Sequence, residues 1–259
     1  MNSSGLSGQR VCVTGASRGI GARACEVLSK AGAQVLGIAR SQGELFDLRE
    51  RLTGQGLDFD FAALDLTATD ASQRLDSLFA GFVPDVFVNN AGATRPAAFQ
   101  DVSLEDFDRV MGLNVRAGFF ASQAVVRAMI ANPASGNRRA IIHLGSMLGE
   151  VALPGRSVYA ATKHAMLGLT KAMALDLAPH GIRVNALGPT YIETPLTEPL
   201  LNDPAFRQFV SDRMPLSVPD RPIGQLQDLD GALLFLADSS LSGLVTGTSV
   251  VVDGGWTAQ

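Results

Sequence analysis

The stretch Thr14-Gly-Ala-Ser-Arg-Gly-Ile-Gly21 (TGASRGIG) follows directly on a short apolar run, Arg10 to Thr14. Such a run is typical of a buried strand, and a helical spacing of apolar residues begins at Gly19. Glycines between a strand and a helix let the backbone approach a pyrophosphate, which the helix N-terminus attracts. The stretch therefore predicts a phosphate site, with a tight loop that binds nothing as the alternative.

Strand-like and helix-like segments alternate along the whole chain. Further apolar runs of strand length are Gln34 to Ala39, Asp58 to Leu64, Asp85 to Asn89, Ala140 to Gly145, Ile182 to Gly188 and Thr248 to Val252. Segments with helical spacing are Gly19 to Ala31, Gln42 to Leu52, Ala68 to Ala80, Ser103 to Ile130, Val158 to Leu177 and Gln227 to Ala237. This alternation predicts an α/β fold: a single Rossmann-type, doubly wound sheet of seven parallel strands with helices on both faces.

The lack of linkers, repeats and low-complexity tracts predicts one domain over residues 1–259. The exception is the segment 190–222, which carries six prolines and an interrupted helical spacing. We interpret this segment as a lid of short helices above the carboxyl ends of the strands, with an irregular surface crossover as the alternative.

Composition restricts the partners of this chain. Its 259 residues are 46% hydrophobic and 18% charged, which suits a globular protein. A net charge of −4 without a basic run argues against nucleic acid and anionic membranes, so small molecules are the expected partners. Cys12 and Cys25 supply no disulfide framework and no metal-ligand spacing, so no metal is expected. A polar N-terminus and the lack of a long apolar run predict a soluble protein of the reducing cytoplasm.

A second group of residues, Ser146, Tyr159 and Lys163, is typical of a proton-transfer site. Ser146 closes the predicted fifth strand at its carboxyl end, where open α/β sheets bind ligands. Tyr159 and Lys163 are one helical turn apart, so their Cβ atoms lie about 6 Å from each other on one face. A nearby ammonium favours the ionised phenol, which makes Tyr159 an acid or base near neutral pH. An arbitrary Tyr-x-x-x-Lys pair is more often structural, but the upstream serine and glycine-rich turn favour catalysis.

Together these motifs resemble the short-chain dehydrogenase/reductase family in its single-domain branch, and the match spans the whole chain. The segments that carry it are TGASRGIG at 14–21, Asp65-Leu66, Asn89-Asn-Ala-Gly92, Asn114, Ser146, Tyr159, Lys163, Arg183-Val-Asn-Ala-Leu-Gly-Pro189, Thr194 and Val252-Asp-Gly-Gly255. Two positions depart from the family pattern: Gly145 stands where relatives often have a second serine, and Thr190 replaces the usual glycine after Pro189.

The resemblance implies four catalytic residues: Asn114, Ser146, Tyr159 and Lys163. Tyr159 would exchange a proton with the substrate oxygen, to which Ser146 would also hydrogen-bond. Lys163 would lower the pKa of Tyr159 and hold the nicotinamide ribose, and Asn114 would hold a water molecule of a proton relay. The hydride chemistry would belong to the cofactor.

The resemblance also places the cofactor. The residues expected to bind it are Gly15, Ser17, Arg18, Gly19, Ile20, Gly21, Arg40, Asp65, Leu66, Asn90, Ala91, Gly92, Tyr159, Lys163, Pro189, Thr190, Ile192 and Thr194. At the end of the second strand, Ala39 and Arg40 stand where NAD enzymes have an acid for the ribose 2′-hydroxyl. Arg40 and Arg18 suit a 2′-phosphate, so NADP(H) is the preferred cofactor and NAD(H) the alternative.

The expected reaction interconverts a secondary alcohol and a ketone, and the resemblance is greatest to members that act on sugars, ketoses and polyols. The expected substrate pocket contains Thr94, Arg95, Ser146, Met147, Glu150, Leu153 and Tyr191. One alternative is a 3-oxoacyl-carrier-protein reductase, for which Arg95, Arg138 and Arg139 would form a basic patch. A second alternative is a non-catalytic dinucleotide-binding protein. A serine hydrolase is excluded because leucines occupy the glycine positions of a nucleophile elbow around Ser146.

Two predicted helices, Ser103 to Ile130 and Val158 to Leu177, carry more apolar residues than one buried stripe requires. These residues include Phe119, Phe120, Met166, Leu167 and Met173. Extra apolar faces indicate subunit contacts. With the resemblance, this predicts a homotetramer, or next a dimer; burial within the chain is the alternative.

Overall fold

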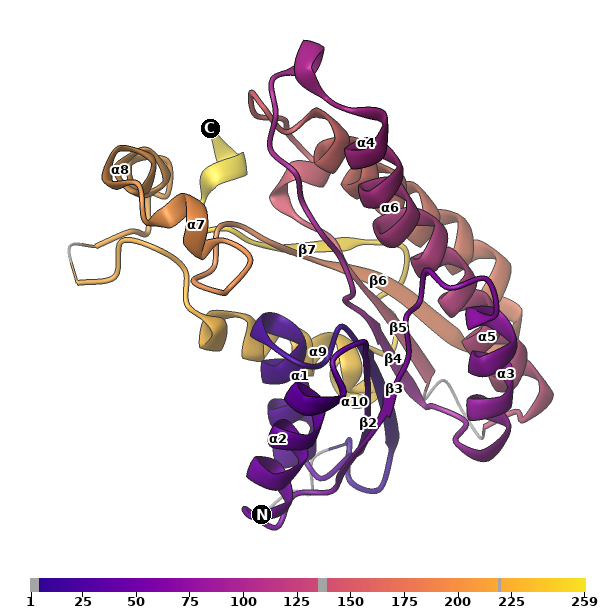
Figure 1. Ribbon diagram of the computed structural model, residues 1–259. Helices are drawn as coiled ribbons and strands as arrows, with labels where there is room; N and C mark the ends of the chain where they lie inside the picture. The colour runs from indigo at the N-terminus through magenta and orange to yellow at the C-terminus, as the bar shows by residue number, and fades with distance from the viewer. Residues whose placement is uncertain (1–4, 135–138, 219) are drawn as a thin grey trace.

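A seven-stranded parallel sheet forms the centre of the computed structural model, which describes residues 5–134, 139–218 and 220–259 (Figure 1). The strands are β1 (Arg10–Thr14), β2 (Gln34–Ala39), β3 (Phe59–Ala63), β4 (Val86–Asn89), β5 (Arg139–Leu144), β6 (Ile182–Pro189) and β7 (Ser249–Val252). Their spatial order is β3-β2-β1-β4-β5-β6-β7, and all neighbours are parallel. The predicted fold class is confirmed, and the predicted strand ends differ from the observed ones by one residue or none.

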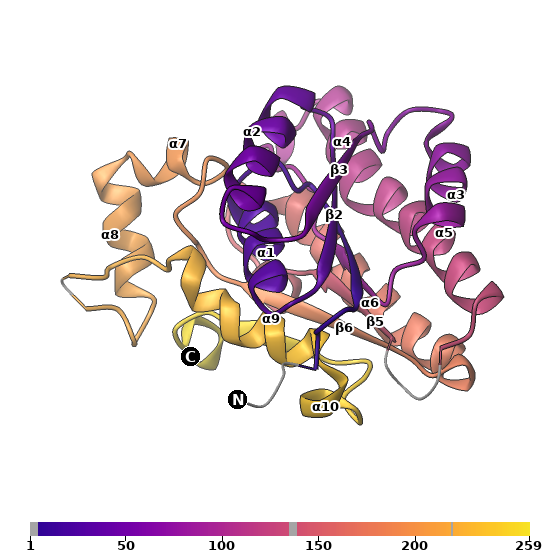
Figure 2. The same ribbon diagram turned by 90° about the horizontal axis from the view of Figure 1, so that it is seen from below.

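Helices cover both faces of the sheet (Figures 1 and 2). On one face lie α1 (Gly19–Lys30), α2 (Gln42–Thr53) and α9 (Asp230–Ala237); on the other lie α3 (Ala71–Gly81), α4 (Leu104–Met111), α5 (Gly118–Ala131) and α6 (Ser157–Leu177). The strands supply alternate side chains to two cores, so Val11 and Val13 face α1 while Cys12 faces α5. No helix in the described part of the chain is long and apolar enough to cross a membrane.

Shorter elements connect these layers. The 3-10 turns are η1 (Phe99–Asp101), η3 (Met147–Gly149), η4 (Ala178–His180), η5 (Leu226–Leu229) and η6 (Trp256–Ala258), and α10 is Ser239–Ser242. The predicted helix Ser103 to Ile130 is interrupted, because the π-helical segment η2 (Gly112–Ala117) joins α4 to α5. π-turns widen a helix without ending it and are frequent at functional sites. Apolar spacing alone did not predict this widening.

The winding of the chain reverses next to β1, which pairs with β2 on one side and with β4 on the other. Ligands of open α/β sheets bind in the crevice at the carboxyl ends of such strands. The hydroxyl of Thr14, which ends β1, accepts hydrogen bonds from the backbone N–H groups of Asn90 (3.0 Å) and Ala91 (3.1 Å). The loop after β4 is therefore fixed to the glycine-rich turn after β1.

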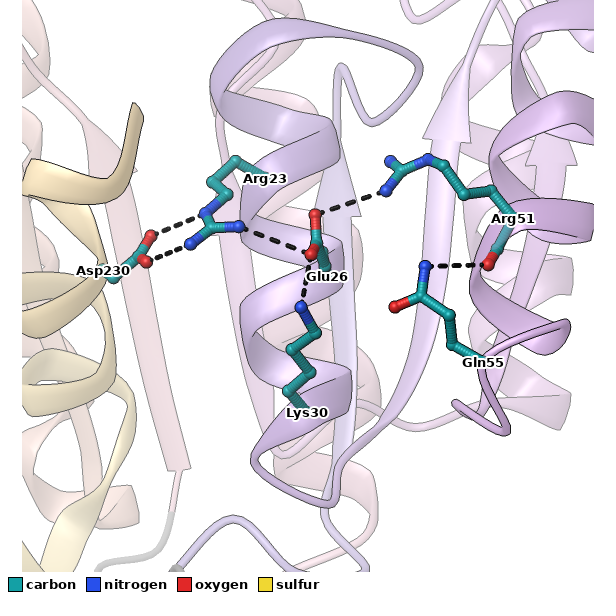
Figure 3. A network of polar contacts seen from close by, with 6 residues as sticks. All are labelled: Arg23, Glu26, Lys30, Arg51, Gln55 and Asp230. Atoms are coloured by element: carbon teal, nitrogen blue, oxygen red, sulfur yellow. Dashed lines mark hydrogen bonds and ion pairs between the residues drawn. The ribbon is translucent and has the colours of Figure 1, made fainter. Parts of the chain in front are cut away.

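Ion pairs fix α1 between its two neighbours (Figure 3). The guanidinium of Arg23 donates to both carboxylate oxygens of Asp230 on α9, at 3.0 and 2.5 Å. One turn further along α1, Glu26 pairs with Lys30 (2.5 Å) and with Arg51 of α2 (3.3 Å). The hydrogen bond from Lys30 is the largest cause of the lowered pKa of Glu26. Because α1 begins at the crevice, this network also steadies the turn that precedes it.

The segment 190–222 contains two short helices, α7 (Glu198–Leu201) and α8 (Pro204–Asp212), which lie beyond the sheet near the chain's C-terminus (Figure 1). Glu193 ties its beginning to α8 by accepting a hydrogen bond from Arg207 at 2.5 Å. Short helices were expected here, whereas closure of this segment as a lid stays a prediction, as does the single domain over 1–259. Residues 1–4 and 135–138 and Pro219, which those predictions include, lie outside the described residues.

Some of the extra apolar residues of the two long helices are buried within this chain, and others are exposed. Met166 and Leu167 on α6 are buried within this chain, so their apolar character needs no partner subunit. Phe119 and Phe120 on α5 are 42% and 40% exposed. On α6, Leu175 is 79% exposed, so subunit contacts stay a prediction for both helices.

Candidate active site

A crevice of about 600 Å³ opens at the carboxyl ends of the strands. Each residue predicted to bind the cofactor lines it, from Gly15 in the first turn to Thr194 after β6. These residues come from distant parts of the chain, and the parallel sheet brings them together because it ends all its strands at one edge. Glu44, in the first turn of α2, also lines the crevice and was not predicted.

The glycine-rich turn leaves no room for a side chain at Gly15 or Gly21. Gly15 has a φ of +65°, in the left-handed region that disfavours residues with a Cβ. A Cβ on Gly21 would overlap the carbonyl oxygen of Gly15 and lie 2.6 Å from the amide nitrogen of Asn90. The backbone at the start of α1 is therefore open to the crevice, as close approach of a pyrophosphate requires.

Two exposed arginines, Arg18 and Arg40, line the same crevice. The carboxylate of Asp65 accepts hydrogen bonds from the backbone N–H (2.9 Å) and the hydroxyl (2.7 Å) of Thr67. Burial raises the pKa of Asp65, but the hydrogen bonds from Thr67 and the charge of Arg40 outweigh it, so the pKa is lowered. Asp65 stays ionised, and the guanidinium groups are available to an added phosphate.

Ser146, Tyr159 and Lys163 lie together between the end of β5 and the first turns of α6. The Ser146 hydroxyl accepts a hydrogen bond from the backbone N–H of Leu148 at 3.1 Å, which fixes the serine at the start of η3. The buried Lys163 ammonium donates to the carbonyl oxygen of Leu144 at 2.6 Å. It lies 5.4 Å from the centre of the Tyr159 ring. Three of the four predicted catalytic residues therefore line the crevice, whereas the fourth, Asn114, does not.

Burial dominates the acid–base properties of this cluster. It raises the pKa of Tyr159 to about 12, although a hydrogen bond with Ser146 and the charge of Arg156 act in the opposite direction. Burial also lowers the pKa of Lys163 to about 8. The Lys163 ammonium donates to the carbonyl of Leu144, and its predicted effect on the pKa of Tyr159 stays a prediction. Tyr159 is therefore protonated at neutral pH and holds a proton that it can donate.

Asn114 lies in the π-helical segment and joins the β4 loop to α6. Its side chain accepts a hydrogen bond from the backbone N–H of Ala93 (2.8 Å) and donates to the Ala93 carbonyl (2.9 Å) and the Thr162 hydroxyl (3.1 Å). Asn114 thus holds the loop that carries Asn90 to Gly92 against the catalytic helix. Its role in a water relay stays a prediction.

A smaller pocket of about 60 Å³ adjoins the crevice. Its lining consists of Thr94, Ser146, Met147, Leu148, Arg156, Tyr159, Thr190, Tyr191, Leu196, Thr197 and Leu200. Ser146, Tyr159 and Thr190 line both spaces. A molecule in the smaller pocket and a molecule in the crevice would therefore meet at the hydroxyls of Ser146 and Tyr159.

With this geometry in place, comparison with known proteins identifies the family. Residues 9–205 match the family described as short chain dehydrogenase. The chain belongs to the short-chain dehydrogenase/reductase family. It is thus an oxidoreductase that acts on CH–OH groups.

Relatives of this short-chain dehydrogenase match over nearly their whole length. Gluconate 5-dehydrogenase of Gluconobacter oxydans (strain 621H) is 38% identical over 256 residues, which cover 98% of this chain and 96% of that protein. L-xylulose reductase of Mesocricetus auratus is 37% identical over 252 residues, covering 97% and 98%. The crystal structure of a gluconate 5-dehydrogenase from Burkholderia cenocepacia J2315 in complex with NADP and tartrate has a TM-score of 0.91 at 34% identity, covering 99% and 98%.

Only some of the residues predicted to form the substrate pocket line the smaller pocket. Of the seven residues, Thr94, Ser146, Met147 and Tyr191 line the smaller pocket. Arg95, Glu150 and Leu153 do not. The exposed Arg95 is 3.6 Å from Asp106, Glu150 is exposed, and Leu153 packs against the apolar cluster that contains Met147. These three side chains have solvent or other partners, so proximity in sequence did not bring them into the pocket.

Sequence reasoning missed Arg156, which lines the smaller pocket and is 7% exposed. Its position was informative, because a residue three before Tyr159 at the start of a helix lies on the same side as the tyrosine. Leu196, Thr197 and Leu200 also line the pocket and come from the predicted lid. Trp256 lies behind the pocket, with its ring 5.8 Å from that of Tyr191.

Proposed function

We propose that this protein is an NADP(H)-dependent oxidoreductase that interconverts a secondary alcohol and a ketone in a sugar, ketose or polyol-like small molecule. The observation that carries the proposal is the position of Ser146 and Tyr159, whose side chains line both the cofactor crevice and the smaller pocket. A substrate oxygen in the smaller pocket would lie within reach of both hydroxyls and of the contents of the crevice.

In this proposal the bound nicotinamide supplies or accepts the hydride, and the residues of this chain handle the proton and the substrate oxygen. Tyr159 donates a proton to the carbonyl oxygen during reduction and accepts it during oxidation. Ser146 hydrogen-bonds the same oxygen and stabilises its developing charge. Lys163 orients the nicotinamide ribose, and Asn114 connects the site to solvent.

The preference for NADP(H) over NAD(H) rests on Arg18 and Arg40 in the crevice. A 2′-phosphate would accept charge-assisted hydrogen bonds from both guanidinium groups. The relative from Burkholderia cenocepacia, which was solved with NADP, supports this choice. Replacement Arg40→Asp should shift kcat/KM in favour of NAD; an unchanged ratio between the two cofactors would contradict the assignment.

The alternative of a 3-oxoacyl-carrier-protein reductase has less support. Arg139 is buried at the start of β5, where it donates to the carbonyl of Met129 and lies 4.0 Å from Asp85. This is the end of the sheet opposite to the pocket. Arg95 is paired with Asp106, and Arg138 lies outside the described residues. The described residues of the expected patch therefore do not gather beside the pocket.

A screen of nicotinamide absorbance tests the proposal. Pure protein with NADP(H) or NAD(H) is mixed with sugars, sugar acids, polyols, diketones and acyl thioesters. Turnover of a sugar-like substrate is expected, and Tyr159→Phe should abolish it while dinucleotide binding, followed by fluorescence, is retained. Preference for the acyl thioester would favour the reductase alternative. A lack of any turnover with intact dinucleotide binding would favour a non-catalytic binding protein.

A further inference from the structure

Arg156 is a buried cation without an acidic partner. It is 7% exposed, and none of the ion pairs among the described residues involves it. Its guanidinium lies over the ring of Phe206 at 5.9 Å, and its charge acts on Tyr159 and Tyr191. A guanidinium does not lose its proton in proteins, so its burial is costly unless a ligand supplies the opposite charge.

Next to this cation, the hydroxyl of Tyr191 lacks a hydrogen-bond acceptor. The residue is 7% exposed, and the Arg156 guanidinium is close enough to its hydroxyl to act on its pKa by charge and hydrogen bonding. Within the described chain the hydroxyl still makes no hydrogen bond of good geometry. Burial raises the pKa of Tyr191, so the phenol stays neutral and can donate. Arg156 and Tyr191 both line the smaller pocket. Buried polar groups in proteins almost always have partners, so a buried hydroxyl with no acceptor next to a buried cation with no acid indicates a missing anionic acceptor.

The surroundings of Arg156 favour an anion. Among the described residues that line the smaller pocket, Arg156 is the one with a charged side chain; the others are apolar or carry hydroxyls or a thioether. Arg156 directly precedes α6, a helix of 21 residues, and its side chain makes no capping hydrogen bond. The helix N-terminus therefore adds positive potential to that of the guanidinium.

We propose that the smaller pocket binds the carboxylate of a sugar acid, with the Arg156 guanidinium as its ion-pair partner and the Tyr191 hydroxyl as a second donor. The planar fork of a guanidinium matches the two oxygens of a carboxylate. The hydroxyl-bearing carbons then extend toward Ser146 and Tyr159. This inference rests on the proposed function and narrows its substrate class from sugars and polyols in general to hydroxy acids.

Kinetics with a matched pair of substrates test the role of Arg156. The pair consists of an aldonate and the neutral alditol with the same carbon chain and configuration. The wild type should prefer the aldonate, and Arg156→Gln should lower the aldonate-to-alditol ratio of kcat/KM by about 10- to 100-fold, mainly through KM. Arg156→Lys should recover part of the ratio. Arg109→Gln, which makes the same change of charge at an exposed position of α4, should keep the wild-type ratio.

Two kinetic outcomes would overturn the inference. One is a wild type that does not prefer the acid. The other is an equal loss on both substrates in Arg156→Gln, which would mean that Arg156 only shapes the pocket wall through Phe206.

Binding can also be followed without turnover, because Trp256 is the single tryptophan of the sequence and lies 5.8 Å from Tyr191. In Tyr159→Phe, titration with the aldonate should change the tryptophan fluorescence with saturation. The double variant with Arg156→Gln should bind about 10- to 100-fold more weakly. Tighter binding of a sugar phosphate than of the aldonate would refute the carboxylate assignment.

The two measurements separate the two proposals. Saturable, Arg156-dependent binding without turnover in the wild type would support the anion site and contradict the proposed function. Turnover of the aldonate and the alditol with equal kcat/KM would support the proposed function and contradict the anion site.

Discussion

The ammonium of Lys163 donates a hydrogen bond to the carbonyl oxygen of Leu144 at 2.6 Å. Lys163 belongs to α6 and Leu144 is the last residue of β5, so this bond joins the catalytic helix to the strand that leads to Ser146. The side chain of Lys163 is buried where it makes this bond, and burial lowers its pKa to about 8.

We expect Lys163→Met to change the pH dependence of stability. The pKa of Lys163 is about 8 in the folded protein and 10.5 as the ordinary value. Between these values the unfolded chain binds more protons, so this group lowers stability as the pH falls through the interval. The free energy of unfolding of the wild type, relative to Lys163→Met, should rise by roughly 3 kcal/mol from neutral pH to above 10.5. Urea denaturation of both proteins measures this; a constant difference would refute it.

Reduction and oxidation should differ in their response to pH. Because the pKa of Tyr159 is about 12, the phenol is protonated throughout the neutral range. Ketone reduction, which needs the proton, should not slow through loss of the Tyr159 proton between about pH 6 and 9, and any change near pH 8 should be absent in Lys163→Met. Alcohol oxidation, which needs an acceptor, should become faster as the pH rises over the same range. Steady-state rates in both directions with saturating cofactor test this, and a pH-independent oxidation step limited by chemistry would contradict it.

Replacement Gly21→Ala should weaken dinucleotide binding. The added methyl group would overlap the Gly15 carbonyl and press on the amide of Asn90, so the turn must open. We expect a Kd for NADPH about 10- to 100-fold higher and a loss of about 1–3 kcal/mol in stability. Fluorescence titration and thermal unfolding measure the two effects.

A matched control for that experiment is Gly43→Ala in the first turn of α2, where an added Cβ meets nothing within 4 Å. It should retain the wild-type affinity and change stability by less than about 1 kcal/mol. Equal affinities of the two variants would mean that the turn after β1 tolerates a side chain.

The predicted homo-oligomer should depend on α5. Phe119 and Phe120 form an edge-to-face pair at 5.4 Å, yet about two fifths of each residue is exposed. Exposed aromatic pairs on a helix face indicate a contact with another subunit. Light scattering should show a tetramer or dimer for the wild type and a smaller species for Phe119→Glu/Phe120→Glu. The same mass for both proteins would exclude this face from the interface.

Much of the fold was predictable because its signals are local. Apolar runs such as Val11 to Val13 and the glycines at Gly15 and Gly21 reflect constraints that act within a few residues. The predicted cofactor residues all line the crevice because strand ends in a parallel sheet share one edge. The contacts of Asn114 in the π-helical segment were not predictable, since its hydrogen-bond partners Ala93 and Thr162 belong to other elements.

The sequence by itself determined the sheet and the glycine-rich turn, and it predicted Ser146, Tyr159 and Lys163 as the reacting groups, because motif spacing and apolar periodicity are properties of the chain. Only the tertiary structure decided the electrostatics around them. Burial raises the pKa of Tyr159, the Leu144 carbonyl holds Lys163, and Arg156 lies in the smaller pocket with no acidic residue among the described residues that line it. Desolvation and pairing depend on which side chains from distant segments surround a group, and no stretch of sequence states that.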